Sequence, residues 1–133
     1  MRPEWADEIE QIHQSAVKKS GIVPWASEDV RFLTLALAGE VGELANMIKK
    51  HWRGDIVPHP GFDAAVHAEL ADIRVYLHLL ATALPRSGAH LKTVVFGIDL
   101  DEAVKVKLPA IRDKFLQLGE KPADWDAKHR QGG

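Results

Sequence analysis

The sequence predicts an all-α protein, a single domain built like a four-helix bundle. Apolar residues recur at three- and four-residue intervals in four segments, as they do along one face of a helix. Stretches containing glycine and proline separate these segments, and 133 residues are enough to form one hydrophobic core. We expect the helical domain to cover residues 1–119 and a polar tail to follow at 120–133.

The composition argues against several classes of protein. With 46% hydrophobic and 27% charged residues, the chain is typical of a soluble globular protein. The net charge of -2 gives no general reason to bind a nucleic-acid polymer or an anionic membrane. The absence of cysteine excludes disulfides, thiolate metal sites and cysteine nucleophiles. No secretory signal or spanning segment is visible, so we expect a cytoplasmic protein.

The first predicted helix covers residues 4–19 and ends at Ser20-Gly21. Its expected inward stripe consists of Trp5, Ile9, Ile12 and Ala16. Glu10 and His13 form a Glu-x-x-His pair of the kind that binds metal in di-iron bundles. Because that signature needs two such pairs and further carboxylates, we expect these two residues on a solvated flank of the helix instead.

A connector carrying Trp25 leads to the second helix, which we expect to run to about Trp52. Tryptophan in such a connector is more often part of the core than a ligand contact. Ser27 is the expected N-cap, and the acidic residues that follow it, Glu28 and Asp29, oppose the helix dipole.

Two carboxylates interrupt the apolar face of this second helix. Glu40 and Glu43 lie on the face defined by Leu33, Leu37, Leu44 and Ile48. Burying them without compensation would be costly, so we expect a cation to meet them. The glycines beside them, Gly39 and Gly42, are expected to let helices approach closely.

The end of the second helix is basic, with Lys49, Lys50, His51 and Arg53. These cations either complement the C-terminal end of the helix dipole or face polyphosphate oxygens. The nearby glutamate pair favours the second interpretation.

The third helix is predicted at about residues 62–84 and ends before Pro85. Helical spacing places His67, Arg74 and His78 away from its apolar face, which consists of Ala65, Val66, Ile73, Tyr76, Leu79, Leu80 and Ala83. Glu69 and Asp72 fall inside this apolar arc. They are a second carboxylate pair with a spacing of three.

The fourth helix is expected to begin at a cap formed by Asp99 or Asp101, after an irregular connection whose residues 94–96 pack against the core. Its apolar stripe consists of Leu100, Val104, Leu108, Ile111 and Phe115. Pro109 lacks the amide that would bond to Lys105 and should kink this helix.

Two acidic pairs on consecutive antiparallel helices define an all-oxygen pocket. Such a pocket suits hard divalent cations, above all Mg²⁺, with Mn²⁺ as a substitute. Without a cation, the four charges would repel one another and several would take up protons. The cations Lys49, Lys50 and Arg53 point to phosphate chemistry, in which one of the acids orients or deprotonates a water molecule. There is no Walker loop.

The motifs Glu40-Val41-Gly42-Glu43-Leu44 and Glu69-Leu70-Ala71-Asp72 resemble those of the MazG-like, all-α nucleoside triphosphate pyrophosphohydrolases. Tyr76 and the stretch 97–104 with Lys107 also resemble this family. The resemblance covers about residues 28–115. Unlike many members, the chain has Ile111 where an asparagine is common, and Pro109 interrupts the fourth helix.

The resemblance implies Mg²⁺-dependent hydrolysis of nucleoside triphosphates to monophosphates and pyrophosphate, by a homodimer or homotetramer. It implies that Glu40, Glu43, Glu69 and Asp72 are catalytic metal ligands, and we expect Lys49, Lys50, Arg53 and Lys107 to bind phosphate. Tyr76, Trp25 and Trp52 are candidates for stacking on the base. The alternatives are a phosphoribosyl-ATP pyrophosphohydrolase and a non-enzymatic helical dimerisation or regulatory module.

Overall fold

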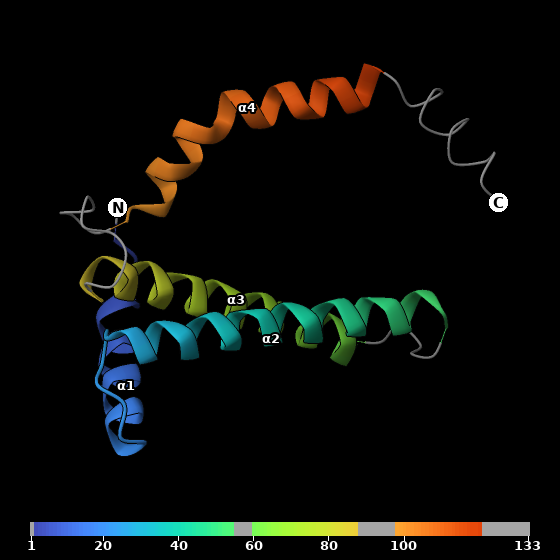
Figure 1. Cartoon of the computed structure of the whole chain (residues 1–133). Helices are drawn as coiled ribbons and strands as arrows, with labels where there is room; N and C mark the ends of the chain where they lie inside the picture. The colour runs from blue at the N-terminus through green and yellow to red at the C-terminus, as the bar shows by residue number, and fades with distance from the viewer. Residues whose placement is uncertain (1, 55–59, 88–97, 121–133) are drawn as a thin grey trace. The chain divides into compact units, whose positions relative to one another are not determined.

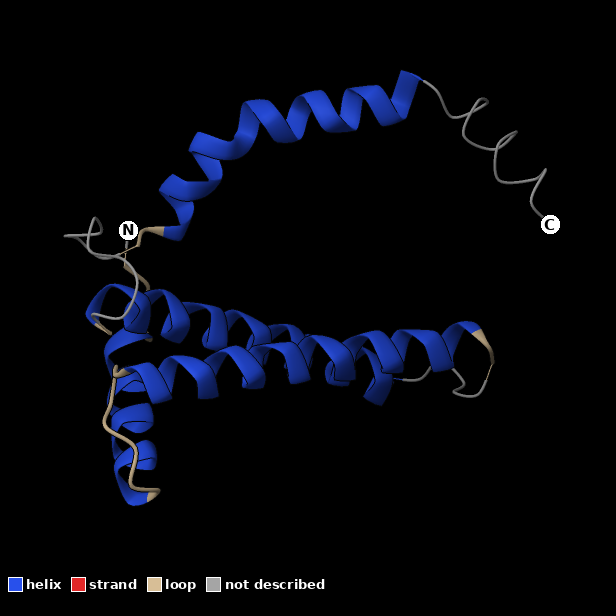
Figure 2. Ribbon diagram, in the orientation of Figure 1, coloured by secondary structure: helices blue, strands red, loops and turns tan. Residues whose placement is uncertain are grey.

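The computed structural model describes residues 2–54, 60–87 and 98–120, and every described regular element is an α-helix (Figures 1 and 2). This confirms the predicted all-α class. The chain divides into two compact units, residues 1–98 and 99–133. The predicted packing of residues 94–96 and the predicted tail, apart from Glu120, lie outside the described residues.

The first unit is organised around an antiparallel pair of long helices, α2 (Ser27–Trp52) and α3 (Pro60–Arg86). They lie side by side along their length, and α1 (Ala6–Lys19) crosses the end where α2 begins and α3 finishes (Figure 1). Leu33 and Ala83 are fully buried and pack with Leu79 in the core. The core therefore lies at the α1 end of the pair. Trp25 packs against it, in agreement with the prediction that this tryptophan is part of the core.

The buried face of α1 differs from the predicted one. Glu10 and His13 are buried, whereas Ile12 is 56% exposed and Ala16 is also exposed. The expectation that Glu10 and His13 lie on a solvated flank is wrong. The reason is that both residues find polar partners inside the unit, which offsets the cost of removing them from water.

Two histidine–carboxylate pairs, one buried and one partly buried, join α1 to the other helices. His13 Nε2 lies 2.8 and 2.9 Å from the two carboxylate oxygens of Asp29 on α2. His78 Nε2 on α3 lies 3.2 Å from Glu10 Oε2, which also accepts a hydrogen bond from Arg2. His78 was expected to point away from the core, and this prediction is wrong because the side chain turns towards Glu10.

The start of α2 also differs from the prediction. Ser27 is the first helical residue rather than the N-cap, and Ala26 at the cap position makes no side-chain hydrogen bond. The side-chain hydrogen bond at this end of α2 is made by Asp29, whose Oδ2 accepts the backbone amide of Trp25 at 2.8 Å. Trp25 has a φ of 65°, an unusual value for a bulky residue, and this hydrogen bond helps to hold it there.

Helix α3 extends beyond the predicted range at both ends. Pro60 stands at its first position, where a missing amide costs nothing. Pro85 lies inside the last turn, so the helix continues to Arg86 rather than stopping before the proline. Gly39 and Gly42 on α2 have open space where a Cβ atom would stand, so no described part of the chain makes the expected close approach.

The second unit contains α4 (Leu100–Glu120), which bends along its length (Figure 1) and includes Pro109. Asp99 Oδ1 accepts the amides of Asp101 and Glu102 at 3.0 and 3.1 Å, so Asp99 is the cap. Apolar side chains of α4 are exposed among the described residues, with Phe115 at 66%. None of the four helices, over its described residues, combines the length and apolarity needed to cross a membrane.

Replacing Asp29 by alanine should lower the free energy of unfolding by about 3 kcal/mol. The substitution leaves His13 and the Trp25 amide without their buried partner. Urea denaturation measures the loss. Asp63→Ala is the control, because Asp63 and His67 form an exposed pair at 3.6 Å and its loss should cost less than about 1 kcal/mol. Equal losses in the two variants would contradict a structural role for Asp29.

The first turn of α4 should loosen in acid. The hydrogen bond from the Glu102 amide is the largest cause that lowers the pKa of Asp99, and the bond from the Asp101 amide acts in the same direction. This stabilisation is present above the unfolded pKa of about 3.9 and is lost as the pH falls through the lower folded value. Amide hydrogen exchange should show Asp99→Ala unprotected at every pH. Asp99→Asn should keep the cap without the pH response, and a response unchanged in Asp99→Asn would rule out titration of Asp99 as its cause.

Candidate metal centre

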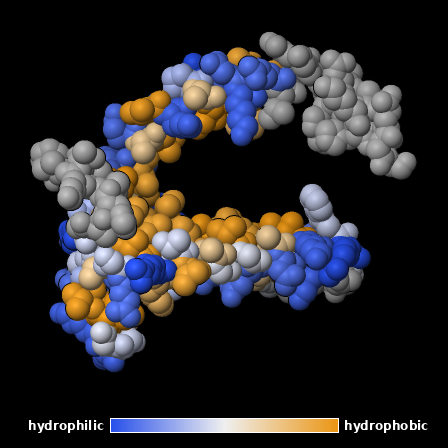
Figure 3. Space-filling view, in the orientation of Figure 1, coloured by the Kyte–Doolittle hydropathy of each residue, from blue (hydrophilic) through white to orange (hydrophobic). Residues whose placement is uncertain are grey.

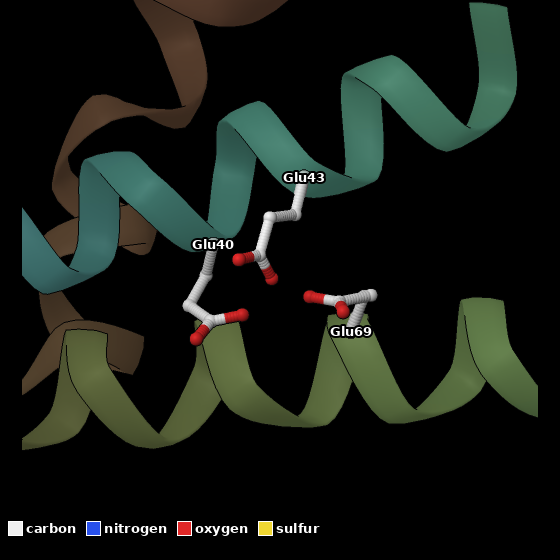
Figure 4. Close-up of side chains that lie close together, drawn as sticks. All are labelled: Glu40, Glu43 and Glu69. Atoms are coloured by element: carbon white, nitrogen blue, oxygen red, sulfur yellow. The ribbon is translucent and has the colours of Figure 1, made fainter.

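Three glutamates converge midway along the α2–α3 pair. Glu40 and Glu43 project from successive turns of α2, and Glu69 projects from the facing turn of α3 (Figure 4). One carboxylate oxygen from each residue lies within 4.8 Å of the other two. The antiparallel pairing thus brings together two acidic motifs that are far apart in the sequence.

Two of these carboxylates have a buried oxygen with no partner. Glu40 and Glu69 are half-buried, and Oε2 of each makes no hydrogen bond with any described residue. Glu43 is exposed. A buried acceptor without a donor is costly, so these two oxygens are suited to a cation that approaches from between the helices.

The electrostatics of the cluster also favour added positive charge. The contact with the Glu69 carboxyl raises the pKa of Glu40, and burial and the charges of Glu69 and Asp72 raise it further. The contact with Glu43 acts in the opposite direction. Like charges held this close favour either a proton or a metal ion.

Asp72 lies at the edge of the cluster. It is exposed and falls outside the group of three ligand atoms, although its charge acts on both Glu40 and Tyr76. The structure therefore brings three of the four predicted acids into direct reach of one another and leaves Asp72 one helical turn after Glu69.

Tyr76 connects the acidic cluster to the core. Its side chain is half-buried and packs against the core of Leu33, Leu79 and Ala83. Burial, followed by the charges of Glu40 and Asp72, raises the pKa of its hydroxyl. Tyr76 is therefore a base-stacking candidate that lies close enough to the acids for their charges to act on its hydroxyl.

The two tryptophan candidates lie elsewhere. The Arg86 guanidinium covers the Trp25 ring at 5.4 Å, at the α1 end of the helix pair. Trp52 is 84% exposed at the opposite end, about 13 Å beyond Glu43 along α2. The described structure therefore does not bring these rings next to the acids.

The predicted phosphate-binding cations are exposed. At 100° per residue, Lys50 lies on the same side of α2 as Glu43, whereas Lys49 lies on nearly the opposite side from Glu40. Arg53 follows the last residue of α2. Lys107 belongs to α4 in the second unit.

The residues of the cluster fit a hard divalent cation. The donors are all carboxylate oxygens, and two of them are buried without partners. Mg²⁺ binds one or two carboxylates and completes its octahedral shell with water and phosphate oxygens, and Mn²⁺ accepts the same donors. Two half-buried acids and one exposed acid would supply the carboxylates and leave the metal accessible to water and phosphate.

Sequence reasoning missed the paired residues of α1. Their partners are 16 and 68 positions away in the sequence, so no local motif shows the pairs. One signal was available: Ala6, Glu10, His13 and Val17 follow helical spacing, and together they form the buried face.

The fold and the site define a class of protein: all-α, with an acidic site between two long helices that is suited to a metal ion. Over 90 residues the chain is 36% identical to dCTP pyrophosphatase 1 of Mus musculus and of Rattus norvegicus. The aligned region covers 64% of this chain and 45% of each relative, so the chain spans less than half of their length. No family model and no solved structure matches.

Replacing Glu69 by glutamine should weaken binding of Mg²⁺ and Mn²⁺ at least about tenfold, because it replaces a charged carboxylate ligand by a neutral amide. Isothermal titration calorimetry measures the affinity. In EDTA the variant should be no less stable than the wild type, because the repulsion from Glu40 is relieved. Glu28→Gln, an exposed site in the first turn of α2, is the control. Unchanged affinity in Glu69→Gln would exclude this metal centre.

Proposed function

We propose that this protein is a Mg²⁺-dependent nucleoside triphosphate pyrophosphohydrolase that releases a nucleoside monophosphate and pyrophosphate. The observation that carries the proposal is the convergence of Glu40, Glu43 and Glu69 with two unpartnered buried oxygens. The similarity to dCTP pyrophosphatase 1 supports nucleotide pyrophosphatase chemistry. It also makes dCTP the first substrate to test, beside other canonical and modified triphosphates of the cytoplasmic pool.

In this proposal Glu40, Glu43 and Glu69 would hold the metal, and Asp72, the fourth predicted ligand, is the acid that is not fully engaged with it. A bound Mg²⁺ supplies charge neutralisation and Lewis acidity to the phosphate oxygens. Asp72, at the exposed edge, orients a water molecule and accepts its proton. The water oxygen bonds to the α-phosphorus, the bond from that phosphorus to the α–β bridging oxygen breaks, and pyrophosphate leaves.

The remaining predicted residues have supporting roles. Lys50 lies on the same side of α2 as Glu43, so it is the first residue proposed to stabilise the negative charge of the phosphates. Lys49, Arg53 and Lys107 stay predictions from the sequence. Tyr76 is the preferred stacking residue for the base, because it is half-buried and the charges of Glu40 and Asp72 act on its hydroxyl.

We also propose that the chain works as a homo-oligomer, either a dimer or a tetramer. Large apolar side chains are exposed on α4 and on the outer side of α2, among them Val106, Phe115 and Leu35. Exposed apolar groups of this size are stabilised when a second copy covers them.

The enzyme should release pyrophosphate from at least one triphosphate in Mg²⁺ or Mn²⁺, and EDTA should abolish the reaction. Glu40→Gln should lower kcat at least about 100-fold with retained helicity, because the metal loses a central ligand. Asp63→Asn, at an exposed position on α3, is the control. The assay combines a triphosphate panel and phosphoribosyl-ATP with coupled detection of pyrophosphate. If no compound yields pyrophosphate, the enzymatic proposal fails and a dimerisation module is favoured.

A further inference from the structure

His51 is a polar residue at the end of the α2–α3 seam. Its ring stacks on Phe62 of α3, with centroids 4.6 Å apart and planes 21° from parallel. Its Nδ1 atom is buried and has no hydrogen-bond partner among the described residues. A buried lone pair without a partner is tolerated better than a buried N–H, so the ring proton belongs on Nε2.

His51 shares the face of α2 that carries the acidic cluster. At 100° per residue it lies about 20° from Glu40, and about 12 Å beyond Glu43 along the helix. The same count on α3 places Phe62 about 20° from Glu69. The stacked pair therefore continues the seam from which the three glutamates project.

Basic residues share the end of α2 that carries His51. Lys50 lies about 100° from His51 around the helix and Lys49 lies on its far side. Hydrophilic residues gather at this end of α2 in Figure 3. The opposite direction along the seam leads to Tyr76 and the apolar core, which would suit a base rather than phosphate. A ring already held by stacking also loses little conformational freedom when it binds a ligand.

We propose that His51 is a phosphate-binding residue, whose Nε2–H donates a hydrogen bond to the terminal phosphates of a triphosphate and to the departing pyrophosphate. The choice of a triphosphate as the ligand rests on the proposed function. The ring stack with Phe62 and the acidic cluster on the same face of α2 are the observations that carry the assignment.

Two substitutions separate this role from simple packing. His51→Phe keeps an aromatic ring against Phe62 but removes the donor, whereas His51→Gln places an amide donor near the position of Nε2. Calorimetry of the full chain with Mg²⁺ and inorganic pyrophosphate should show about tenfold weaker binding for His51→Phe. His51→Gln should recover most of the affinity, and thermal unfolding of His51→Phe should match the wild type.

His67→Phe is the matched control, because His67 is an exposed histidine on α3. Equal pyrophosphate affinity in the wild type and His51→Phe would overturn the proposal, as would a wild type that binds no pyrophosphate. Nitrogen-15 NMR that places the His51 proton on Nδ1 would also overturn it. If the wild type cleaves no triphosphate but His51→Phe still loses affinity, the proposed reaction fails and His51 stands as a phosphate-binding residue.

Discussion

The close approach of like charges between α2 and α3 is the constraint on which the rest of the structure depends. Two long helices normally stabilise each other with a continuous apolar seam, yet here the seam contains Glu40, Glu43 and Glu69 at its middle. Burial of unpartnered carboxylate oxygens opposes folding of this region, so stability must come from elsewhere along the pair.

The compensation lies at the two ends of the seam. At the α1 end, Leu33, Leu79 and Ala83 form the buried core, and α1 is attached by His13–Asp29 and Glu10–His78. At the other end, His51 stacks on Phe62. Buried polar pairs contribute little net stability compared with apolar packing, but they define one arrangement of the helices, because a displaced α1 would leave several charged groups unpaired.

The second unit and the outer side of α2 share a different property. Apolar side chains of α4 are exposed, and Gly39 and Gly42 of α2 have open space beside them. Glycine inside a helix costs stability relative to alanine, and exposed apolar surface gains nothing from folding. An oligomer that covers these surfaces would account for both features, in agreement with the proposed assembly.

The sequence by itself determined the four helices and the two acidic pairs, and it limited the cap of α4 to Asp99 or Asp101, because periodicity, spacing and capping depend on residues within a few turns. It did not determine that Asp72 lies at the edge of the cluster, that α1 buries Glu10 and His13 in place of Ile12, or that His51 faces Phe62. Only the tertiary structure decided these points. They depend on the register of antiparallel helices and on partners up to 68 residues apart, which local patterns do not encode. The carboxylates that interrupt the apolar face of α2 were visible in the sequence, and the antiparallel pairing of α2 and α3 brings Glu69 close to them.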